Sequence, residues 1–390
     1  MKSFQIAHCP SLYFGPGKLS ALDAVLAGQG FRNLAVVTGS SSLRTSERWA
    51  GLKKTFAAGG REFTAFSLRG EPSPKFIDDA VAQLRDRPPQ VVIAIGGGSV
   101  IDAGKAISAM MMEQHPSLEF LEGVGTRKPS GRKIPFIAVP TTSGTGSEAT
   151  KNAVLSSVSQ GGFKKSLRHD GYVPDLAILD PELSLSCPPD VTAACGMDAV
   201  TQLLEGFVST QSNPLTDALS RSGLSAAGRS LERAVEAGGT DLEARGEMAY
   251  AAYLSGIVLA NAGLGVVHGI ASPLGGHFPI SHGVVCGTLI AEACRTTIRR
   301  LKEEGRGESI SKYAEAGTLL SGRDSGSVEG NCELLVATLA SWIERFALPT
   351  LGSFGLAEED LRSIARESDS KSAPIALTET EIFEIMRARR

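Results

Sequence analysis

The first half of the chain alternates short apolar runs with stretches whose apolar residues recur at helical spacing. The apolar runs are rich in Val, Ile and Ala, and most of them end at Gly or Pro, which is typical of buried strands. They cover residues 33–39, 62–66, 90–98 and 134–140. The helical spacing occurs between them, in residues 43–58, 75–84 and 99–112. This alternation predicts a parallel, Rossmann-like sheet with crossover helices.

The pattern changes after residues 176–194, where a DPEL segment and two following prolines interrupt it. Almost no strand pattern remains beyond residue 193. Long helical stretches follow instead, in residues 198–209, 214–237, 242–262, 287–304, 309–320 and 332–346. We therefore expect two domains: an α/β dinucleotide-binding domain over residues 1–182 and an all-helical domain over residues 183–390.

Composition narrows the function classes. The chain has 390 residues, of which 42% are hydrophobic and 21% charged, as in an ordinary globular enzyme. A net charge of −3 provides no attraction for nucleic acid or an anionic membrane, so neither is expected as a partner. No apolar run approaches the roughly 20 residues that cross a bilayer, and the N-terminus lacks the apolar core of a signal peptide. Six cysteines without a CxxC spacing indicate reduced thiols, and a cytoplasmic protein is expected.

A glycine-rich turn follows the third apolar run. Gly96, Gly97, Gly98 and Ser99 stand between that run and the next helical stretch, where backbone N–H groups at a helix start could approach a diphosphate. A simple tight turn is the alternative. A second loop, PTTSGTGSE at residues 140–148, follows the next apolar run and is rich in hydroxyls. Two such loops at the ends of parallel strands converge on one crevice, so a nucleotide is the expected ligand.

Two histidines, His268 and His282, lie in a stretch of small and apolar residues at 263–283. Upstream, Asp198 and Gln202 are four residues apart, a spacing that places both side chains on one face of a helix. An Asp, a neighbour one turn on and two His from a second segment suit a divalent cation that would polarise a substrate oxygen. A helical domain that merely stabilises the first domain is the alternative.

Several motifs occur in the order and spacing of one known family. They are GGGSVIDAGKA, PTTSGTGSEAT, LAILDPEL, GMDAVTQLLEGFVS and GLGVVHGIASPLGG…SHG. Over nearly its whole length the chain resembles the iron-dependent (group III) alcohol dehydrogenase family. The resemblance implies a dehydroquinate synthase-like architecture and a nicotinamide cofactor, NADP or NAD, in the cleft between the domains. It also implies interconversion of alcohols with aldehydes or ketones, and a dimer or higher homo-oligomer.

The resemblance assigns contacts to the cofactor as well. It implies that Gly97, Gly98 and Ser99 wrap the pyrophosphate and that Asp102 lies near the nicotinamide ribose or carboxamide. Three hydroxyl side chains are expected beside the phosphates and ribose: Thr141, Thr142 and Thr145. Lys164 matches a family lysine that reaches the cofactor, with an ordinary surface lysine as the alternative.

One difference from the NAD-preferring relatives lies at the end of the first apolar run. Those relatives carry an acid that holds the 2′-hydroxyl of the adenosine ribose, whereas this chain has Gly39. Loss of the carboxylate removes repulsion against a 2′-phosphate. The phosphate could be bound by the residues that follow: Ser40, Ser41, Ser42 and Arg44. The sequence therefore favours NADP(H), or the use of both cofactors.

The metal of this family has one Asp and three His ligands. Asp198, His268 and His282 match three of these positions, and Gln202 stands in place of the remaining His. Gln is a weak ligand, but one carboxylate and two imidazoles can still hold Fe²⁺ or Zn²⁺. Without a metal, the same polar cluster can carry out acid–base chemistry.

The expected reaction is reduction of a small carbonyl compound, or its reverse. The substrate oxygen would lie against the metal, and the nicotinamide would transfer the hydride. A further family His close to the nicotinamide is replaced by Ser272. A proton would arrive through ribose hydroxyls, water or His277, which is otherwise a surface histidine. The expected catalytic residues are Asp198, His268, His277 and His282.

Three rival functions remain open. A metal-free reductase resembling the maleylacetate reductases shares the fold and also alters the ligand set. A dehydroquinate synthase is disfavoured, because it needs basic residues around a phosphorylated substrate and none lie near His268 in the sequence. A binding protein that retained the fold without activity is the third rival.

Overall fold

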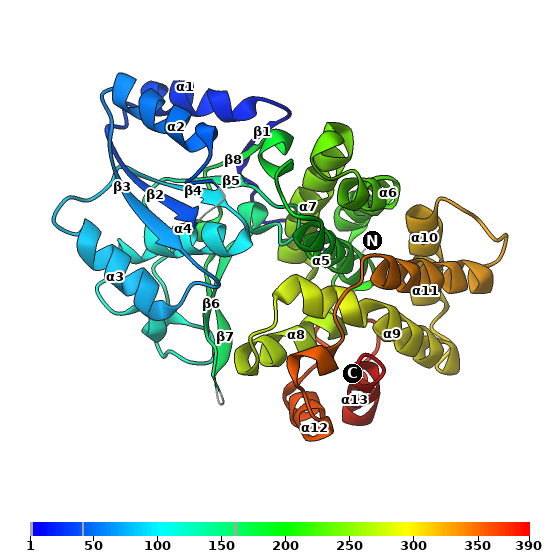
Figure 1. Cartoon of the computed structure of the whole chain (residues 1–390). Coiled ribbons are helices and arrows are strands. Elements are labelled where there is room, and N and C mark those ends of the chain that lie inside the picture. Colours follow the sequence, from blue (N-terminus) through cyan, green and yellow to red (C-terminus); the bar gives the residue numbers. More distant parts are fainter. Residues whose placement is uncertain (1–2, 41–42, 160–161) are drawn as a thin grey trace.

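The computed structural model describes residues 3–40, 43–159 and 162–390. Figure 1 shows two lobes side by side, one built around a sheet and drawn in blue to green, the other made of helices and drawn in green to red. The chain enters the helical lobe only after the last strand, β8 (Leu176–Leu179), is complete. The expected fold class, an α/β lobe followed by an all-helical lobe, is confirmed.

Within the described residues, six strands form one parallel sheet in the order β1-β8-β5-β4-β2-β3. Besides β8, the strands are β1 (Ser11–Phe14), β2 (Asn33–Gly39), β3 (Glu62–Leu68), β4 (Val91–Gly96) and β5 (Phe136–Pro140). Strands β2 and β3 lie on one side of β4, and β5 lies on the other, so the direction of the connections reverses at β4. Open α/β sheets bind ligands outside the carboxyl ends of strands at such a reversal.

Helices cover both faces of the sheet because its central strands are apolar on both sides. In β4, Ile93 and Ile95 pack against α1 and α2, whereas Val92 and Ala94 pack against α3 and α4. Successive strand residues point to opposite faces, and burial of each Val or Ile side chain contributes roughly 1.5–3 kcal/mol. The helices are α1 (Ala21–Gly28), α2 (Glu47–Ala58), α3 (Pro74–Leu84) and α4 (Gly98–Met110).

An antiparallel hairpin, β6 (Asn152–Ser157) and β7 (Phe163–Arg168), extends from the sheet lobe towards the helical lobe. It runs beside α8 in Figure 1, and β7 packs against that helix. Sequence analysis did not predict it, because β7 reads FKKSLR and is too polar to stand out as a strand. The hairpin places Lys164 between the two lobes.

Nine helices form the helical lobe in the described part of the chain. They are α5 (Pro189–Val208), α6 (Pro214–Glu236), α7 (Leu242–Ala262), α8 (Val266–His277), α9 (His282–Glu303), α10 (Gly307–Ser321), α11 (Val328–Arg345), α12 (Glu358–Glu367) and α13 (Glu379–Arg387). Short 3₁₀ helices lie between elements: Lys18–Ser20, Ser117–Phe120, Ser147–Ala149, Asp170–Tyr172, Pro181–Ser184, Gly238–Thr240 and Leu351–Phe354.

Helix α5 begins at Pro189 rather than at residue 198 as predicted. Proline suits the first turn of a helix, where no backbone N–H is lost, so the segment taken for an interdomain loop is the start of α5. The predicted domain boundary between residues 182 and 183 falls in the 3₁₀ helix Pro181–Ser184 and stays a prediction. Helix α8 was not predicted either, because glycines and Pro273 obscure its periodicity.

Among the described residues, no single helix has the length and apolar character needed to cross a membrane. Helices α7 and α8 meet that measure only when joined, and they are bent by 98° relative to each other.

Candidate active site

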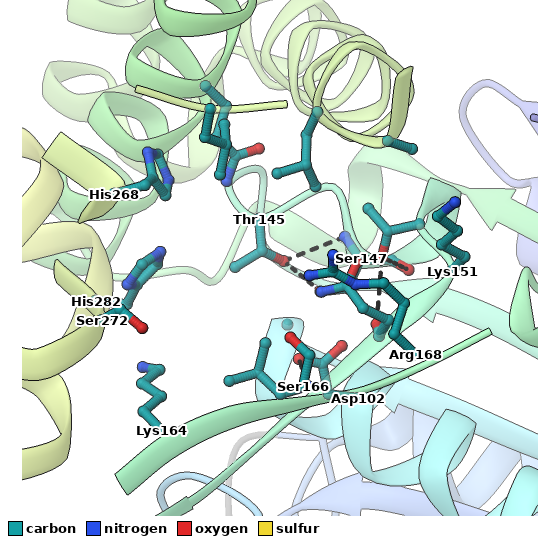
Figure 2. Close-up of a pocket in the computed structure, with 18 of the residues that line it drawn as sticks. Asp102, Thr145, Ser147, Lys151, Lys164, Ser166, Arg168, His268, Ser272 and His282 are labelled. Carbon is teal, nitrogen blue, oxygen red and sulfur yellow. Dashed lines mark hydrogen bonds between the residues drawn. The ribbon is translucent and has the colours of Figure 1, made fainter. Parts of the chain in front are cut away.

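A cavity of about 450 Å³ lies between the two lobes. Gly98, Ser99, Asp102 and Thr145 line it from the sheet lobe. The helical lobe contributes the side chains of Gln202, His268, Ser272 and His282. Figure 2 shows Asp102 and Thr145 on one side of this space, with the two histidines and Ser272 on the other. The loops and the histidine stretch singled out in the sequence therefore meet at one cavity.

The glycine turn after β4 packs directly on the second loop. Gly97 caps α4, and a Cβ atom added at Gly98 would lie 2.4 Å from Oγ1 of Thr145. No other residue can occupy position 98 without moving Thr145. Gly98 and Ser99 line the cavity, so the positive end of the α4 dipole faces it. This arrangement is able to receive a phosphate group.

A buried lysine holds the second loop in place. Nζ of Lys105, on α4, donates hydrogen bonds to the carbonyl oxygens of Ser147 (2.7 Å) and Asn152 (2.8 Å) and to Oγ1 of Thr150 (3.0 Å). Burial lowers the pKa of Lys105 to about 8. Its three donors are thus used for loop structure, and Lys105 anchors the wall of the cavity.

Asp102 presents an unsatisfied oxygen. Its Oδ2 accepts a hydrogen bond from the backbone N–H of Val154 (3.0 Å). Its buried Oδ1 has no partner among the residues that the structure describes. Burial raises the pKa of Asp102. A ligand that brings an N–H or O–H donor to this wall would satisfy Oδ1.

Lys164 reaches the cavity from β7, where its Nζ forms an ion pair with Glu71. Glu71 also accepts a hydrogen bond from Oγ of Ser156 (2.7 Å), and it lines the cavity as well. In Figure 2 Lys164 lies beside His282 and Ser272. Lys164 is therefore a partly buried member of the cavity wall rather than an ordinary surface lysine.

The other expected cofactor contacts lie apart from the cavity. Thr141 and Thr142 line a separate small hollow behind the loop, and Oγ1 of Thr142 packs on Gly97. Gly39 ends β2, with no atom within 4 Å of an added Cβ among the described residues. The Arg44 guanidinium lies over the ring of Trp49, at 5.9 Å from its centroid. Ser41 and Ser42 lie outside the described residues.

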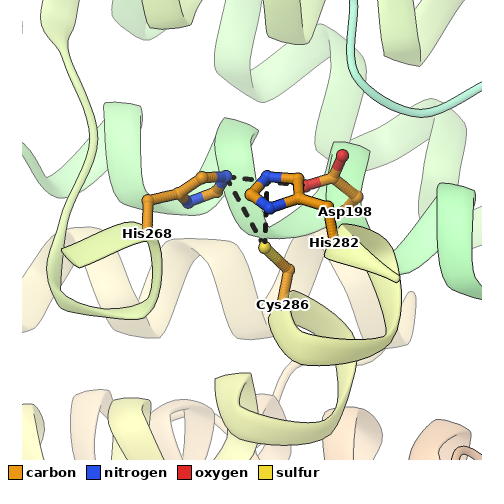
Figure 3. Close-up of side chains that lie close together, drawn as sticks. All are labelled: Asp198, His268, His282 and Cys286. Atoms are coloured by element: carbon orange, nitrogen blue, oxygen red, sulfur yellow. Dashed lines mark hydrogen bonds and ion pairs between the residues drawn. The ribbon is translucent and has the colours of Figure 1, made fainter. Parts of the chain in front are cut away.

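Four side chains converge in the helical lobe beside the cavity (Figure 3): Asp198 of α5, His268 of α8, and His282 and Cys286 of α9. Oδ1 of Asp198 lies 3.5 Å from Nε2 of His268 and 3.7 Å from Nε2 of His282. Sγ of Cys286 lies 3.7 Å from each of the same two nitrogens. All four ligand atoms lie within 4.8 Å of one another, which is the arrangement of a metal site.

Glu205, one turn beyond Gln202 on α5, orients His268. Its carboxylate lies 2.7 Å from Nδ1 of His268 and accepts hydrogen bonds from the backbone N–H groups of Gly265 (2.8 Å) and Val267 (2.7 Å). Because this carboxylate can only accept, Nδ1 of His268 carries a proton, and Nε2 is the ring nitrogen that faces Asp198. Carboxylates support metal-binding histidines in this way.

Burial shapes the protonation of the cluster. It lowers the pKa of His282 to about 4, so that ring is neutral at physiological pH. Burial acts to raise the pKa of Asp198, but His282 and His268 together hold it below its ordinary value. Asp198 is therefore a carboxylate, and yet its Oδ1 has no hydrogen-bond partner in the described chain. A buried anionic oxygen without a hydrogen-bond donor, next to two imidazole nitrogens and a sulfur, is a favourable electrostatic environment for a cation.

Two other predicted residues have different surroundings. Gln202 lines the cavity, and its Oε1 accepts a hydrogen bond from Oγ of Ser255 (2.8 Å). His277 ends α8 and pairs with Glu367, at 2.9 Å between Nε2 and Oε2, away from the cavity lining. Its geometry is that of a surface ion pair and lends no support to a proton relay.

Sequence analysis overlooked Cys286, Glu205 and Glu71. Two of them carry a readable signal: Cys286 stands four residues after His282, and Glu205 stands seven after Asp198 on the same helix face. Glu71 has none, because it lies in a loop and reaches the cavity only through the fold.

The chain matches two family models. "Iron-containing alcohol dehydrogenase" matches residues 9–181, and "Fe-containing alcohol dehydrogenase family, C-terminal" matches residues 192–389. Long-chain-alcohol dehydrogenase 1 of Geobacillus thermodenitrificans is 35% identical over 82% of this chain and 79% of its own length. The NAD-dependent methanol dehydrogenase of Bacillus methanolicus is 28% identical over 97% of each chain. A solved structure of 1,3-propanediol oxidoreductase matches with a TM-score of 0.88, at 28% identity over 100% of both chains.

Glu148, in the second loop, should make the free energy of unfolding depend on pH. Burial raises the pKa of Glu148 to about 7, so the folded protein keeps a proton that the unfolded chain releases near its ordinary value of 4.5. The free energy of unfolding should therefore fall as the pH rises from about 4.5 to about 7, by on the order of 3 kcal/mol. Glu148→Gln should remove this fall, as measured by urea unfolding at about pH 5 and about pH 8. The exposed control Glu359→Gln should retain it, and equal falls in all three proteins would contradict the assignment.

Proposed function

This chain belongs to the iron-containing alcohol dehydrogenase family, and from that premise we propose how its cavity works. It is an NAD-dependent oxidoreductase that interconverts alcohols and carbonyl compounds. We propose a small alcohol or aldehyde as substrate and a divalent metal as a second cofactor. The observation that carries this proposal is that a phosphate-accepting loop pair and a cluster of metal-ligand atoms lie next to one cavity of about 450 Å³.

The residues present fit a divalent metal, either Fe²⁺ or Zn²⁺. Oδ1 of Asp198 is buried and lacks a partner in the described chain, while Glu205 holds His268 with its Nε2 facing that oxygen. We therefore assign Asp198, His268 and His282 as ligands in preference to Gln202, whose uncharged amide oxygen accepts a hydrogen bond from Ser255. A cation held there would supply positive charge that stabilises an alkoxide oxygen.

The sheet lobe fits a nicotinamide cofactor. The start of α4, at Gly97, Gly98 and Ser99, can bind the diphosphate through its backbone N–H groups. Oδ1 of Asp102 has no partner in the described chain and can accept a hydrogen bond from a carboxamide or a ribose hydroxyl. Bound NAD(P)⁺ would supply the hydride acceptor. Thr145 and Lys164 line the same cavity and can orient the ligand, whereas direct contacts of Thr141 and Thr142 stay a prediction.

The proton of the substrate hydroxyl must leave on the cavity side of the cluster. Ser272 and Lys164 lie beside His282 on that side, and His277 does not. We propose that the proton passes to the cofactor ribose or to water near Ser272 and Lys164, with no role for His277.

Metal removal tests this function against its alternative. The alternative is a metal-free reductase resembling the maleylacetate reductases, and the engagement of the weak ligand Gln202 by Ser255 favours it. We expect dialysis against a strong chelator to abolish alcohol oxidation, and Zn²⁺ or Fe²⁺ to restore it, because alkoxide stabilisation by the cation is lost and regained. Elemental analysis before and after dialysis is the measurement. Full activity in protein shown to be free of metal would establish the alternative.

We propose that NADP(H) is accepted besides NAD(H). Among the residues that the structure describes, no atom lies within 4 Å of a Cβ added at Gly39, which ends β2, and position 39 has no carboxylate to repel a 2′-phosphate. Gly39→Asp should weaken NADPH binding by about ten-fold or more, or about 1.4 kcal/mol, and should weaken NADH binding far less. Fluorescence titration of each reduced cofactor gives both constants.

Gly39→Ala is the matched control, because it adds the same Cβ atom into open space without a charge. It should leave the ratio of NADPH to NADH affinity unchanged. An unchanged ratio in Gly39→Asp would contradict the proposed position of the 2′-phosphate.

We also propose a homodimer or higher homo-oligomer in the cytoplasm. Strand β1 is an edge of the sheet, and Leu12, Tyr13 and Phe14 on it are 38–41% exposed. An exposed apolar edge strand is a ready site for pairing with another chain. The six cysteines are free thiols, as a reducing compartment would keep them.

Charge on the edge strand should separate the subunits. Tyr13→Lys is expected to shift the molar mass measured by light scattering towards that of one chain, because an unpaired lysine would be buried in the interface. Leu215→Lys changes an apolar residue of similar exposure, 44%, on the helical lobe and should leave the mass unchanged. A monomeric wild-type protein would end the proposal.

A further inference from the structure

A cysteine is the fourth side chain that converges with Asp198, His268 and His282. It does not stand at any of the ligand positions that the resemblance to the family implies. Cys286 is buried and lies one helical turn after His282 on α9. Figure 3 shows its sulfur turned towards Asp198, His268 and His282 rather than along the helix. Its Sγ lies 3.7 Å from Nε2 of both histidines. We propose that the Cys286 thiolate is a metal ligand and replaces the imidazole that position 202 lacks.

Hydrogen bonding alone does not account for this geometry. A thiol has one hydrogen, so Cys286 can donate to one imidazole nitrogen only. Oδ1 of Asp198 has no hydrogen-bond partner in the part of the chain described. Nε2 of His268 lies 3.5 Å from this oxygen, beyond the usual 2.7–3.2 Å or so of a hydrogen bond. Four ligand atoms therefore converge without hydrogen bonds of ordinary length between them.

The distances suit one cation at the centre. Tetrahedral Zn²⁺ has bonds of about 2.0–2.1 Å to nitrogen or oxygen and about 2.3 Å to sulfur, which puts neighbouring ligand atoms about 3.3–3.6 Å apart. Four of the separations between ligand atoms in the cluster are 3.5, 3.7, 3.7 and 3.7 Å. Small movements of the side chains would therefore close the site around the ion.

Position 202 offers only a weak ligand. The amide oxygen of Gln202 is uncharged, and it already accepts a hydrogen bond from Oγ of Ser255 at 2.8 Å. Cys286 reaches the group from a different helix, α9, with the same four-residue spacing from His282 that position 202 has from Asp198. Two pairs of residues four apart thus supply candidate donors, one pair on α5 and one on α9. The proposed fourth donor comes from the α9 pair, as Cys286, and not from the α5 pair, as Gln202.

The donor set indicates which metal is bound. One thiolate with two imidazoles and a carboxylate is softer than three imidazoles with a carboxylate, and sulfur–nitrogen sets of tetrahedral shape favour Zn²⁺. The thiolate also lowers the total charge of cation and ligands from +1 to zero. His268 and His282 line the cavity, and Cys286 and Asp198 do not, so the sulfur lies on the buried side, away from substrate.

The inference rests on the proposed function in requiring that the cluster binds a metal at all. The test uses the full chain, freed of metal and reloaded with Zn²⁺. X-ray absorption at the zinc edge should show one sulfur at about 2.3 Å from the metal, with the remaining scatterers nitrogen or oxygen. This measurement needs no variant, so it stands even if a substitution at Cys286 impairs folding.

A pair of matched variants assigns the sulfur. Cys286→Ser should abolish the sulfur signal and raise the dissociation constant for Zn²⁺ by about a hundred-fold or more, since loss of a mere supporting partner already costs 10–100-fold. Cys294→Ser alters a second buried cysteine of α9 that lies outside the cluster, and it should retain both the signal and the affinity. Competition with a chromogenic chelator gives the constants.

The possible outcomes distinguish this inference from the proposed function on which it rests. Bound zinc with only nitrogen and oxygen neighbours would overturn the role of Cys286 and leave the proposed metal-assisted reaction standing. Failure of the wild-type chain to bind Zn²⁺ would overturn both. A sulfur signal that persists in Cys286→Ser would assign the ligand to another cysteine and reject the proposal.

Discussion

A charged oxygen buried without a hydrogen-bond donor imposes the main constraint on this molecule. Asp198 is 1% exposed, and its Oδ1 faces two imidazole nitrogens and a sulfur instead of a donor. Removing a carboxylate from water costs several kcal/mol unless a compensating charge or donor is present. The helical lobe nevertheless concentrates three further electron-rich atoms at the same point. A cation at this point would offset the repulsion, and this electrostatic requirement is the basis of the proposed metal site.

The surrounding helices give the cluster its rigidity. Asp198 and Glu205 lie on one face of α5, so a single helix supplies both a ligand and the carboxylate that orients His268. Glu205 also accepts the backbone N–H groups at the start of α8, which ties the position of that helix to the position of its histidine. Opposite the cavity, Lys105 holds the second loop through three hydrogen bonds. Buried charges thus fix both walls, and the space between them stays open for ligands.

Patterns within one element were readable from the sequence, and contacts between elements were not. The run VVIAIGGG predicted β4 and the helix start after it because a continuous apolar run that ends in glycine has few other structures available. Asp198, His268 and His282 could be selected because polar groups stand out in apolar helices. The hairpin β6–β7 was missed, since its polar strands pair only with each other. The place of Glu71 beside Lys164 and the pairing of His277 with Glu367 depend on loop conformations that no local sequence pattern determines.

The position of Cys286 illustrates that a set of metal ligands is identified more reliably from distances in the structure than from positions in the sequence. On α5 and on α9 alike, residues four apart lie one turn apart on the same face, so Asp198 with position 202 and His282 with position 286 are equivalent ways to present two donors. A cation between the helices requires a sufficient number of donors at the right distance, whichever helix provides them. Gln202 accepts a hydrogen bond from Ser255, whereas position 286 carries a buried sulfur 3.7 Å from Nε2 of each histidine. The proposed exchange of an imidazole for a thiolate is therefore a change of helix, in which the fold brings a different donor to the same group of converging atoms.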